Sequence, residues 1–150
     1  MIESLLEMLK SLQHRGTDSS ALSDPKAFLF DKSRNLLVIP VNLYLINRTE
    51  APPEEWAYGQ FVWQGVYIFE VTKTGGFVVK GNVTQVDNAE FYLRQPSLAI
   101  KNDYSLQWID YDQWINRALY IENTLYTVSN SRVQLNSLEN FGLIAQIGLN

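Results

Sequence analysis

The chain has 150 residues and a mass of 17.2 kDa, the size of one domain or of two very small ones. Apolar residues make up 46% of it and charged residues 19%, which excludes a disordered or collagen-like chain. The net charge of −4 argues against nonspecific binding to nucleic acid. A chain without cysteine cannot form disulfides, thiol nucleophiles or cysteine metal sites.

Residues 1–14 predict an amphipathic helix that ends at His14-Arg15-Gly16. Its apolar positions recur at helical spacing: Ile2, Leu5, Leu6, Leu9 and Leu12. The helix either covers a core face or pairs with a partner chain. No apolar run reaches the ~20 residues that span a bilayer, and no signal-peptide pattern is present. We therefore expect a cytoplasmic protein without a membrane span, or an extracellular one if the chain belongs to a longer exported protein.

From residue 25 onward, short apolar runs alternate with turn residues, which predicts antiparallel strands. The first four runs are 27–31, 36–46, 64–71 and 77–86. The second four runs are 118–121, 124–129, 132–136 and 142–147. Pro40 lacks an N–H group and predicts an edge or a bulge within its strand. Gly75-Gly76 supplies the positive φ that a tight hairpin turn needs.

The two sets of four strands form an internal repeat, joined by an aromatic connection over residues 87–117 that we expect to pack against the body. A four-stranded antiparallel unit in tandem is typical of β-propeller blades, although two copies also fit a β-sandwich. The predicted fold class is all-β with one short N-terminal helix, built as two four-stranded sheets. The predicted core residues are Phe28, Phe30, Leu37, Ile39, Tyr67, Phe69, Phe77, Val79, Leu119, Ile121, Tyr126, Val128 and Ile144.

Residues 15–41, 63–71 and 117–139, with the WIDYDQWI segment before the last stretch, resemble the C-terminal portion of archaeal secreted proteins that carry a C-terminal β-propeller domain. The resemblance implies a partial propeller and an extracellular ancestry, and it implies no reaction. It divides the chain into a helix at 1–14 and a two-blade domain at 15–150. Within that domain, blade one covers about 25–86, the connection 87–117 and blade two 118–150.

Two blades are fewer than the roughly four to eight that close a propeller. Apolar blade faces would therefore stay open, and open faces act as interfaces. We expect a homo-oligomer that forms through these faces or through the N-terminal helix, either as a two-fold dimer or as a cyclic trimer. The alternative is that the chain is a fragment of a longer protein.

The aromatic connection holds the main candidate ligand-binding residues, Trp108, Asp110, Tyr111 and Asp112. Aromatic rings beside carboxylates can bind sugars or cations. Asp110 and Asp112, joined by Asp87 or Asp103, are candidate calcium ligands, although solvated loop carboxylates are the favoured interpretation. Packing of the connection is likewise favoured over ligand binding for Trp108 and Trp114, and we place Trp63 in the core.

Asp18, after Gly16, is a further candidate in a rim loop, with turn formation as the favoured interpretation. His14 is the single histidine, and no catalytic elbow or phosphate loop is present. Asn47 and Asn82 lie in N-x-[ST] sequons, and Asn82 falls in a predicted strand.

These observations favour a noncatalytic binding or scaffold module with no resident cofactor, apart from a calcium ion if Asp110 and Asp112 bind one. The alternatives are a hydrolase or lyase that uses loop carboxylates at a propeller mouth, and a fragment without a role of its own.

Overall fold

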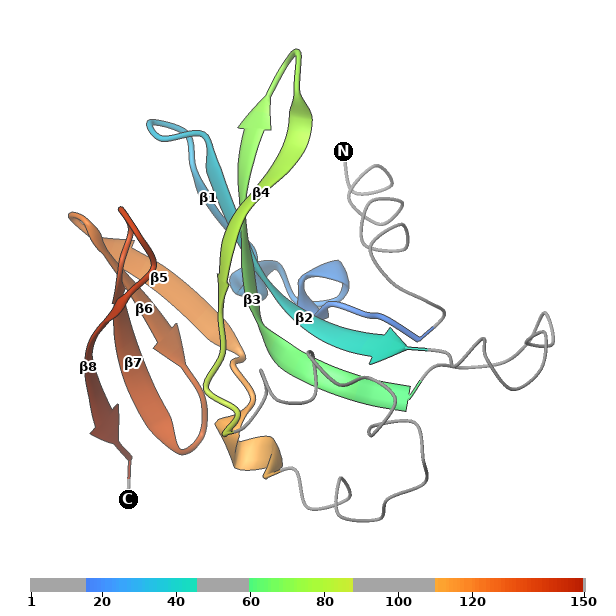
Figure 1. Cartoon of the computed structure of the whole chain (residues 1–150), viewed down its shortest axis with the longest axis vertical. Helices are drawn as coiled ribbons and strands as arrows, with labels where there is room; N and C mark the ends of the chain where they lie inside the picture. The colour runs from blue at the N-terminus through green and yellow to red at the C-terminus, as the bar shows by residue number, and fades with distance from the viewer. Residues whose placement is uncertain (1–15, 46–59, 88–109, 150) are drawn as a thin grey trace, which may run out of the picture.

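The computed structural model of the chain describes residues 16–45, 60–87 and 110–149 (Figure 1). Its strands are β1 (Leu29–Asp31), β2 (Leu36–Leu45), β3 (Gln60–Thr72), β4 (Gly76–Val83), β5 (Arg117–Ile121), β6 (Thr124–Val128), β7 (Arg132–Ser137) and β8 (Leu143–Gly148). Three short 3-10 turns accompany them: η1 (Ser20–Leu22), η2 (Pro25–Ala27) and η4 (Tyr111–Gln113). The amphipathic helix expected at residues 1–14 lies outside the described residues.

The strands form two antiparallel four-stranded sheets, which confirms the predicted all-β class. The first sheet has the order β1-β2-β3-β4 and the second sheet the order β5-β6-β7-β8, each a simple meander. Figure 1 shows the two sheets side by side. Strand β3 begins earlier than the sequence predicts, because its register with β2 continues to the pair Leu45↔Gln60.

Local chemistry explains the turns between the strands. Gly76 closes the β3–β4 hairpin with a φ of +63°, and the Gly75 N–H donates to Thr72 Oγ1. Pro40 lies beyond the last pair of β1 with β2, where its missing N–H removes no ladder bond. The Ser19 hydroxyl donates to the Pro40 carbonyl instead. Strand β2 is an inner strand, so Pro40 is not at a sheet edge; it lies between the last pair with β1 and the bridge Asp18↔Asn42. The irregularity of β2 lies further along, between Leu43 and Tyr44.

The core lies on both faces of the first sheet. The face toward the second sheet buries Val38, Val66, Ile68 and Val83 against Ile115 and Leu125. The opposite face buries Leu37, Ile39, Val41, Leu43, Trp63 and Phe69, with Ala21 and Val86 packed against it. Strand β2 is therefore buried on both sides, and Trp63 is in the core as the sequence predicts.

Arg34 ties the two sheets together at the hairpin ends. Its guanidinium donates to Asp31 Oδ2 at 2.6 Å and to the carbonyl oxygen of Glu122 at 2.7 Å. The guanidinium also lies over the ring of Tyr120, 5.4 Å from its centroid. Hydrogen bonds from Ser33 and then from Arg34 lower the pKa of Asp31 to about 2.

Six residues predicted for the core are exposed, which corrects the sequence-based assignment. They are Phe28, Phe30, Val79, Leu119, Ile121 and Ile144. Phe30 and Val79 lie on edge strands of the first sheet, at the ends of a row whose middle residues, Leu37 and Phe69, are buried. Leu119 and Ile121 point away from the first sheet, and Ile144 sits at an irregularity in edge strand β8.

The other seven predicted core residues divide into two groups. Leu37, Ile39 and Phe69 are fully buried, which confirms their prediction. The half-buried members are Tyr67, Phe77, Tyr126 and Val128.

Candidate functional site

The turn η4 is fixed by hydrogen bonds at one end of the molecule (Figure 1). Asp110 caps it, with Oδ1 accepting from the Asp112 N–H at 3.0 Å. The Asp112 carbonyl accepts from the Ser131 N–H at 3.0 Å, and Asp112 Oδ1 accepts from Asn130 Nδ2 at 3.3 Å. These bonds anchor η4 to the turn between β6 and β7.

Four aromatic rings form a continuous row across this end, which we call the aromatic row. Tyr111 tilts against Trp114 with ring centroids 4.9 Å apart, and Trp114 stacks on Phe61 at 5.1 Å. Phe61 meets Tyr44 edge-on at 5.6 Å. Tyr111, at the free end of the row, is 69% exposed. The expectation that the connection packs against the body is confirmed for its described part.

Asp18 lies at the Tyr44 end of the aromatic row. Its backbone exchanges two hydrogen bonds with Asn42 of β2, and its carboxylate accepts from the Ser19 N–H at 2.8 Å. Burial, followed by the charges of Tyr111 and Asp18, raises the pKa of Tyr44. The bridge to Asn42 places Asp18 two residues from Tyr44 along β2, and the ring contacts through Trp114 and Phe61 connect Tyr111 to the same residue.

Asp87 holds the end of the first sheet to η4. Its N–H donates to Gln113 Oε1 at 3.0 Å, and its Oδ2 accepts from Gln113 Nε2 at 3.1 Å. Arg132 lies 3.7 Å from the same carboxylate oxygen. The carboxylate of Asp87 therefore serves to fix the geometry of this end.

The family model of the β-propeller domain matches residues 5–141 of the chain. The chain belongs to the β-propeller domain family. No curated protein and no solved structure matches it. Among the described residues, no helix is long and apolar enough to cross a membrane. The archaeal and secreted origin that the resemblance implies stays a prediction.

The four candidate residues of the propeller that the structure describes, Asp18, Asp110, Tyr111 and Asp112, all lie at this end of the sheets. Trp108 and Asp103 lie outside the described residues. Within residues 16–45, 60–87 and 110–149, no group of three or more acidic or histidine side chains could hold a metal ion. Of the two sequons, Asn47 is outside the described residues, and Asn82 is exposed on β4.

The sequence analysis missed Tyr44 and Phe61 as parts of the propeller's candidate site. The two residues pair across β2 and β3, at the strand ends that flank the long connection between them. That signal was available, because aromatic residues at both ends of one hairpin connection are brought together by strand pairing. Their contact with Trp114 was not available, since it depends on how η4 folds back.

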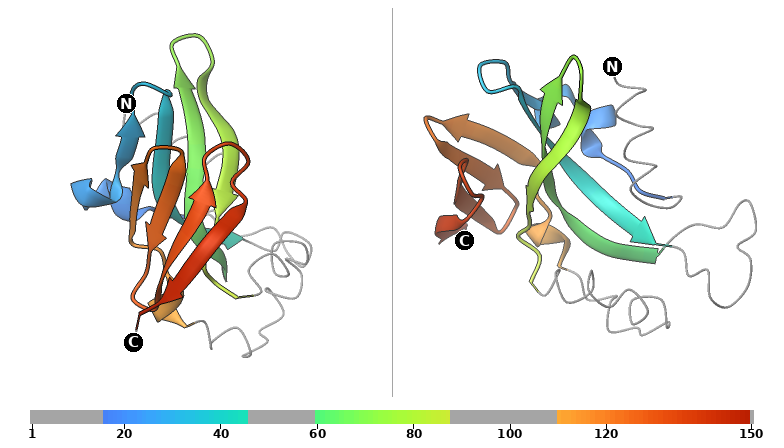
Figure 2. Two further views of the ribbon diagram at one scale, coloured as in Figure 1. Left: turned by 90° about the vertical axis from the view of Figure 1, so that its left-hand side faces the viewer. Right: turned by 45° about the horizontal axis from the view of Figure 1, so that its top comes forward.

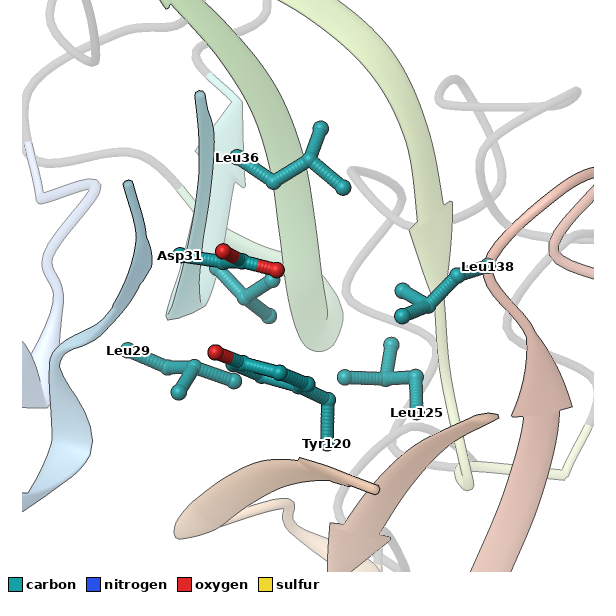
Figure 3. Close-up of a pocket in the computed structure, with 7 residues that line it drawn as sticks. Leu29, Asp31, Leu36, Tyr120, Leu125 and Leu138 are labelled. Carbon is teal, nitrogen blue, oxygen red and sulfur yellow. The ribbon is translucent and has the colours of Figure 1, made fainter. Parts of the chain in front are cut away.

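A separate small pocket opens between the two sheets, beside the β1–β2 hairpin (Figure 3). Leucines from both sheets line it, and the Tyr120 ring lies between Leu29 and Leu125 (Figure 3). Asp31, the one acidic group lining it, is already paired with Arg34. The pocket is therefore part of the inter-sheet contact.

Proposed function

We propose that this propeller-family chain is a noncatalytic binding module, and that the end carrying η4 binds a cationic group such as a lysine or arginine side chain of a partner protein. The observation that carries the proposal is Tyr111, whose exposed ring is held against Trp114 between Asp110 and Asp112. An exposed aromatic face beside carboxylates attracts cations through the ring quadrupole and through charge.

The hydrogen bonds of the carboxylates support a binding role over catalysis. Asp18 and Asp110 each use Oδ1 to fix a backbone N–H, and Asp87 is tied to Gln113 and Arg132. Groups held in this way shape a surface. Among the described residues, the side-chain hydrogen bonds of Asp110 and Asp112 involve Oδ1 in both cases.

A titration with acetylated tetralysine, followed by nuclear magnetic resonance of the Tyr111 and Trp114 signals, tests the proposal. We expect saturable shifts with tetralysine and none with tetraglutamate. The variant Tyr111→Ala should weaken binding by about tenfold, because a cation–π contact contributes roughly 0.5–2 kcal/mol. Tyr111→Phe should retain binding.

The variant Asp112→Asn tests the charge at the proposed site, and Glu139→Gln is its matched control. Glu139 lies in the β7–β8 turn, where it accepts from Asn123 of the β5–β6 turn, at the opposite end from η4. Both variants remove one negative charge, but only Asp112 lies beside Tyr111. If the site is specific, Asp112→Asn should weaken binding and Glu139→Gln should not. Equal effects would show nonspecific attraction. Saturable shifts with a neutral oligosaccharide in place of tetralysine would favour a sugar site.

A further inference from the structure

A positive charge lies beside η4, the turn that carries the proposed cation site. Arg132 is the first residue of β7, and the N–H of its neighbour Ser131 donates to the Asp112 carbonyl at 3.0 Å. The Arg132 side chain is 22% exposed, so its guanidinium is held at the surface next to this turn. A cationic ligand at η4 therefore meets a charge of its own sign.

The carboxylate of Asp87 connects Arg132 to η4. Its Oδ2 accepts from Nε2 of Gln113, a residue of η4, at 3.1 Å and lies 3.7 Å from Arg132 Nη2. The same oxygen thus contacts both the turn and the guanidinium. The negative charge of Asp87 therefore offsets the positive charge of Arg132 at η4.

The range of electrostatic forces decides whether this ion pair acts on a ligand. At physiological salt the screening length is about 8 Å, and surface charges closer than this still interact. Residues of a 3-10 turn rise only ~2 Å each, so Gln113 lies about 4 Å along η4 from Tyr111. The ion pair touches Gln113, and its two charges therefore act on a cation that binds at Tyr111.

We propose, on the basis of the cation site argued above, that Arg132 limits the affinity of η4 for cations and that Asp87 restores it by offsetting Arg132. Like charges repel and opposite charges attract at this distance, so each side chain acts on the ligand with its own sign. The charge that a ligand meets is then the balance of Arg132 against three carboxylates, those of Asp87, Asp110 and Asp112.

A purely structural role of the ion pair predicts a different pattern. If Asp87 and Arg132 only held η4 in place, loss of either charge would loosen the turn and weaken binding. If the two residues act by charge, loss of the Arg132 charge strengthens binding and loss of the Asp87 charge weakens it. The two variants then have effects of opposite sign, which loosening of the turn does not produce.

Titration with acetylated tetralysine at about 0.05 M salt, followed by the nuclear magnetic resonance signals of Tyr111, tests the proposal. Arg132→Gln should lower the dissociation constant about threefold and Asp87→Asn should raise it about threefold, because one surface charge within the screening length has an effect of this order. Arg132→Lys keeps the charge and should bind as the wild type does. In Asp87→Asn the amide oxygen still accepts from Gln113 Nε2, so η4 stays tied. At about 0.5 M salt the differences should shrink, because screening shortens the range of the charges.

The ion pair of Lys80 and Glu70 provides the matched control. Lys80 Nζ lies 3.5 Å from Glu70 Oε2 on the β3–β4 hairpin, whose turn points away from η4 (Figure 2). Lys80→Gln and Glu70→Gln make the same charge changes there and should leave the affinity unchanged. Equal effects at both ion pairs, unchanged or weaker binding in Arg132→Gln, or tighter binding in Arg132→Lys would overturn the proposal. A wild type that does not bind tetralysine would instead refute the cation site itself, and with it the role of Arg132 there.

Discussion

The side chain of Gln64 and the backbone of Ile115 exchange two hydrogen bonds. Gln64 Nε2 donates to the Ile115 carbonyl at 2.8 Å, and the Ile115 N–H donates to Gln64 Oε1 at 2.9 Å. Both residues are buried. The Gln64 amide therefore satisfies the backbone N–H and C=O of Ile115, as a neighbouring strand would, in the segment that leads into the second sheet.

Removing this amide should destabilise the contact between the sheets. Gln64→Ala leaves the buried N–H and carbonyl of Ile115 unpaired, at a cost of about 1–3 kcal/mol in the free energy of unfolding. Urea denaturation measures the loss. Gln146→Ala, which truncates an exposed glutamine, is the control and should change stability by less than about 0.5 kcal/mol. Equal losses would deny Gln64 this role.

Gly81 and Phe141 form a second point of close approach between the sheets. A Cβ at Gly81 would overlap the Phe141 ring, so Gly81→Ala should cost about 1–3 kcal/mol. Gly148→Ala meets no atom within 4 Å and serves as the control. The double variant Gly81→Ala/Phe141→Ala should lose less stability than the sum of the losses in the two single variants, because the shortened side chain at position 141 removes the clash. Strict additivity would contradict the contact.

The Asp31 carboxylate should make stability depend on pH in the acid range. Its pKa is about 2 in the folded chain, below the ordinary value of 3.8. Because the folded pKa is the lower one, the stabilisation is complete above about pH 4 and is lost as the pH falls toward 2. Thermal unfolding of the wild type and of Asp31→Asn should show a stability difference that shrinks over this range. A difference that stays constant from pH 6 to pH 2 would refute the assignment.

Truncating a side chain should cost more stability where the side chain is buried than where it is exposed, and Phe69 and Val79 provide the comparison. Phe69 is fully buried, and Phe69→Ala should cost roughly 3–5 kcal/mol. Its neighbour across β3 and β4, Val79, lies on the same face but is 42% exposed, and Val79→Ala should cost less than about 1 kcal/mol. Chemical denaturation of the pair tests whether the core ends between these two residues.

Calcium binding at Asp110 and Asp112 has a direct test. If the ion binds, millimolar calcium should raise the melting temperature of the wild type, because a ligand of the native state stabilises it. The shift should vanish in the double variant Asp110→Asn/Asp112→Asn, in which the new amide at the capping position still provides a side-chain oxygen for η4. A wild type that does not respond to calcium would remove this hypothesis.

The sequence by itself determined the strands and their grouping. Apolar alternation, Gly75-Gly76 and the repeat of four strands predicted two antiparallel meanders, because hairpin pairing is a local property of strands and turns. Asp110, Tyr111 and Asp112 could likewise be proposed together, since they are neighbours in the chain.

Only the tertiary structure decided which faces of the strands are covered. Phe69 and Leu119 have the same apolar character in the sequence, yet Phe69 is buried and Leu119 is open. Burial of a strand face depends on whether another layer packs against it, and that layer comes from residues far away in the chain. The same reason hid the pairing of Gln64 with Ile115 and the stacking of Trp114 on Phe61, which arise only when the segment before β5 folds back onto the first sheet.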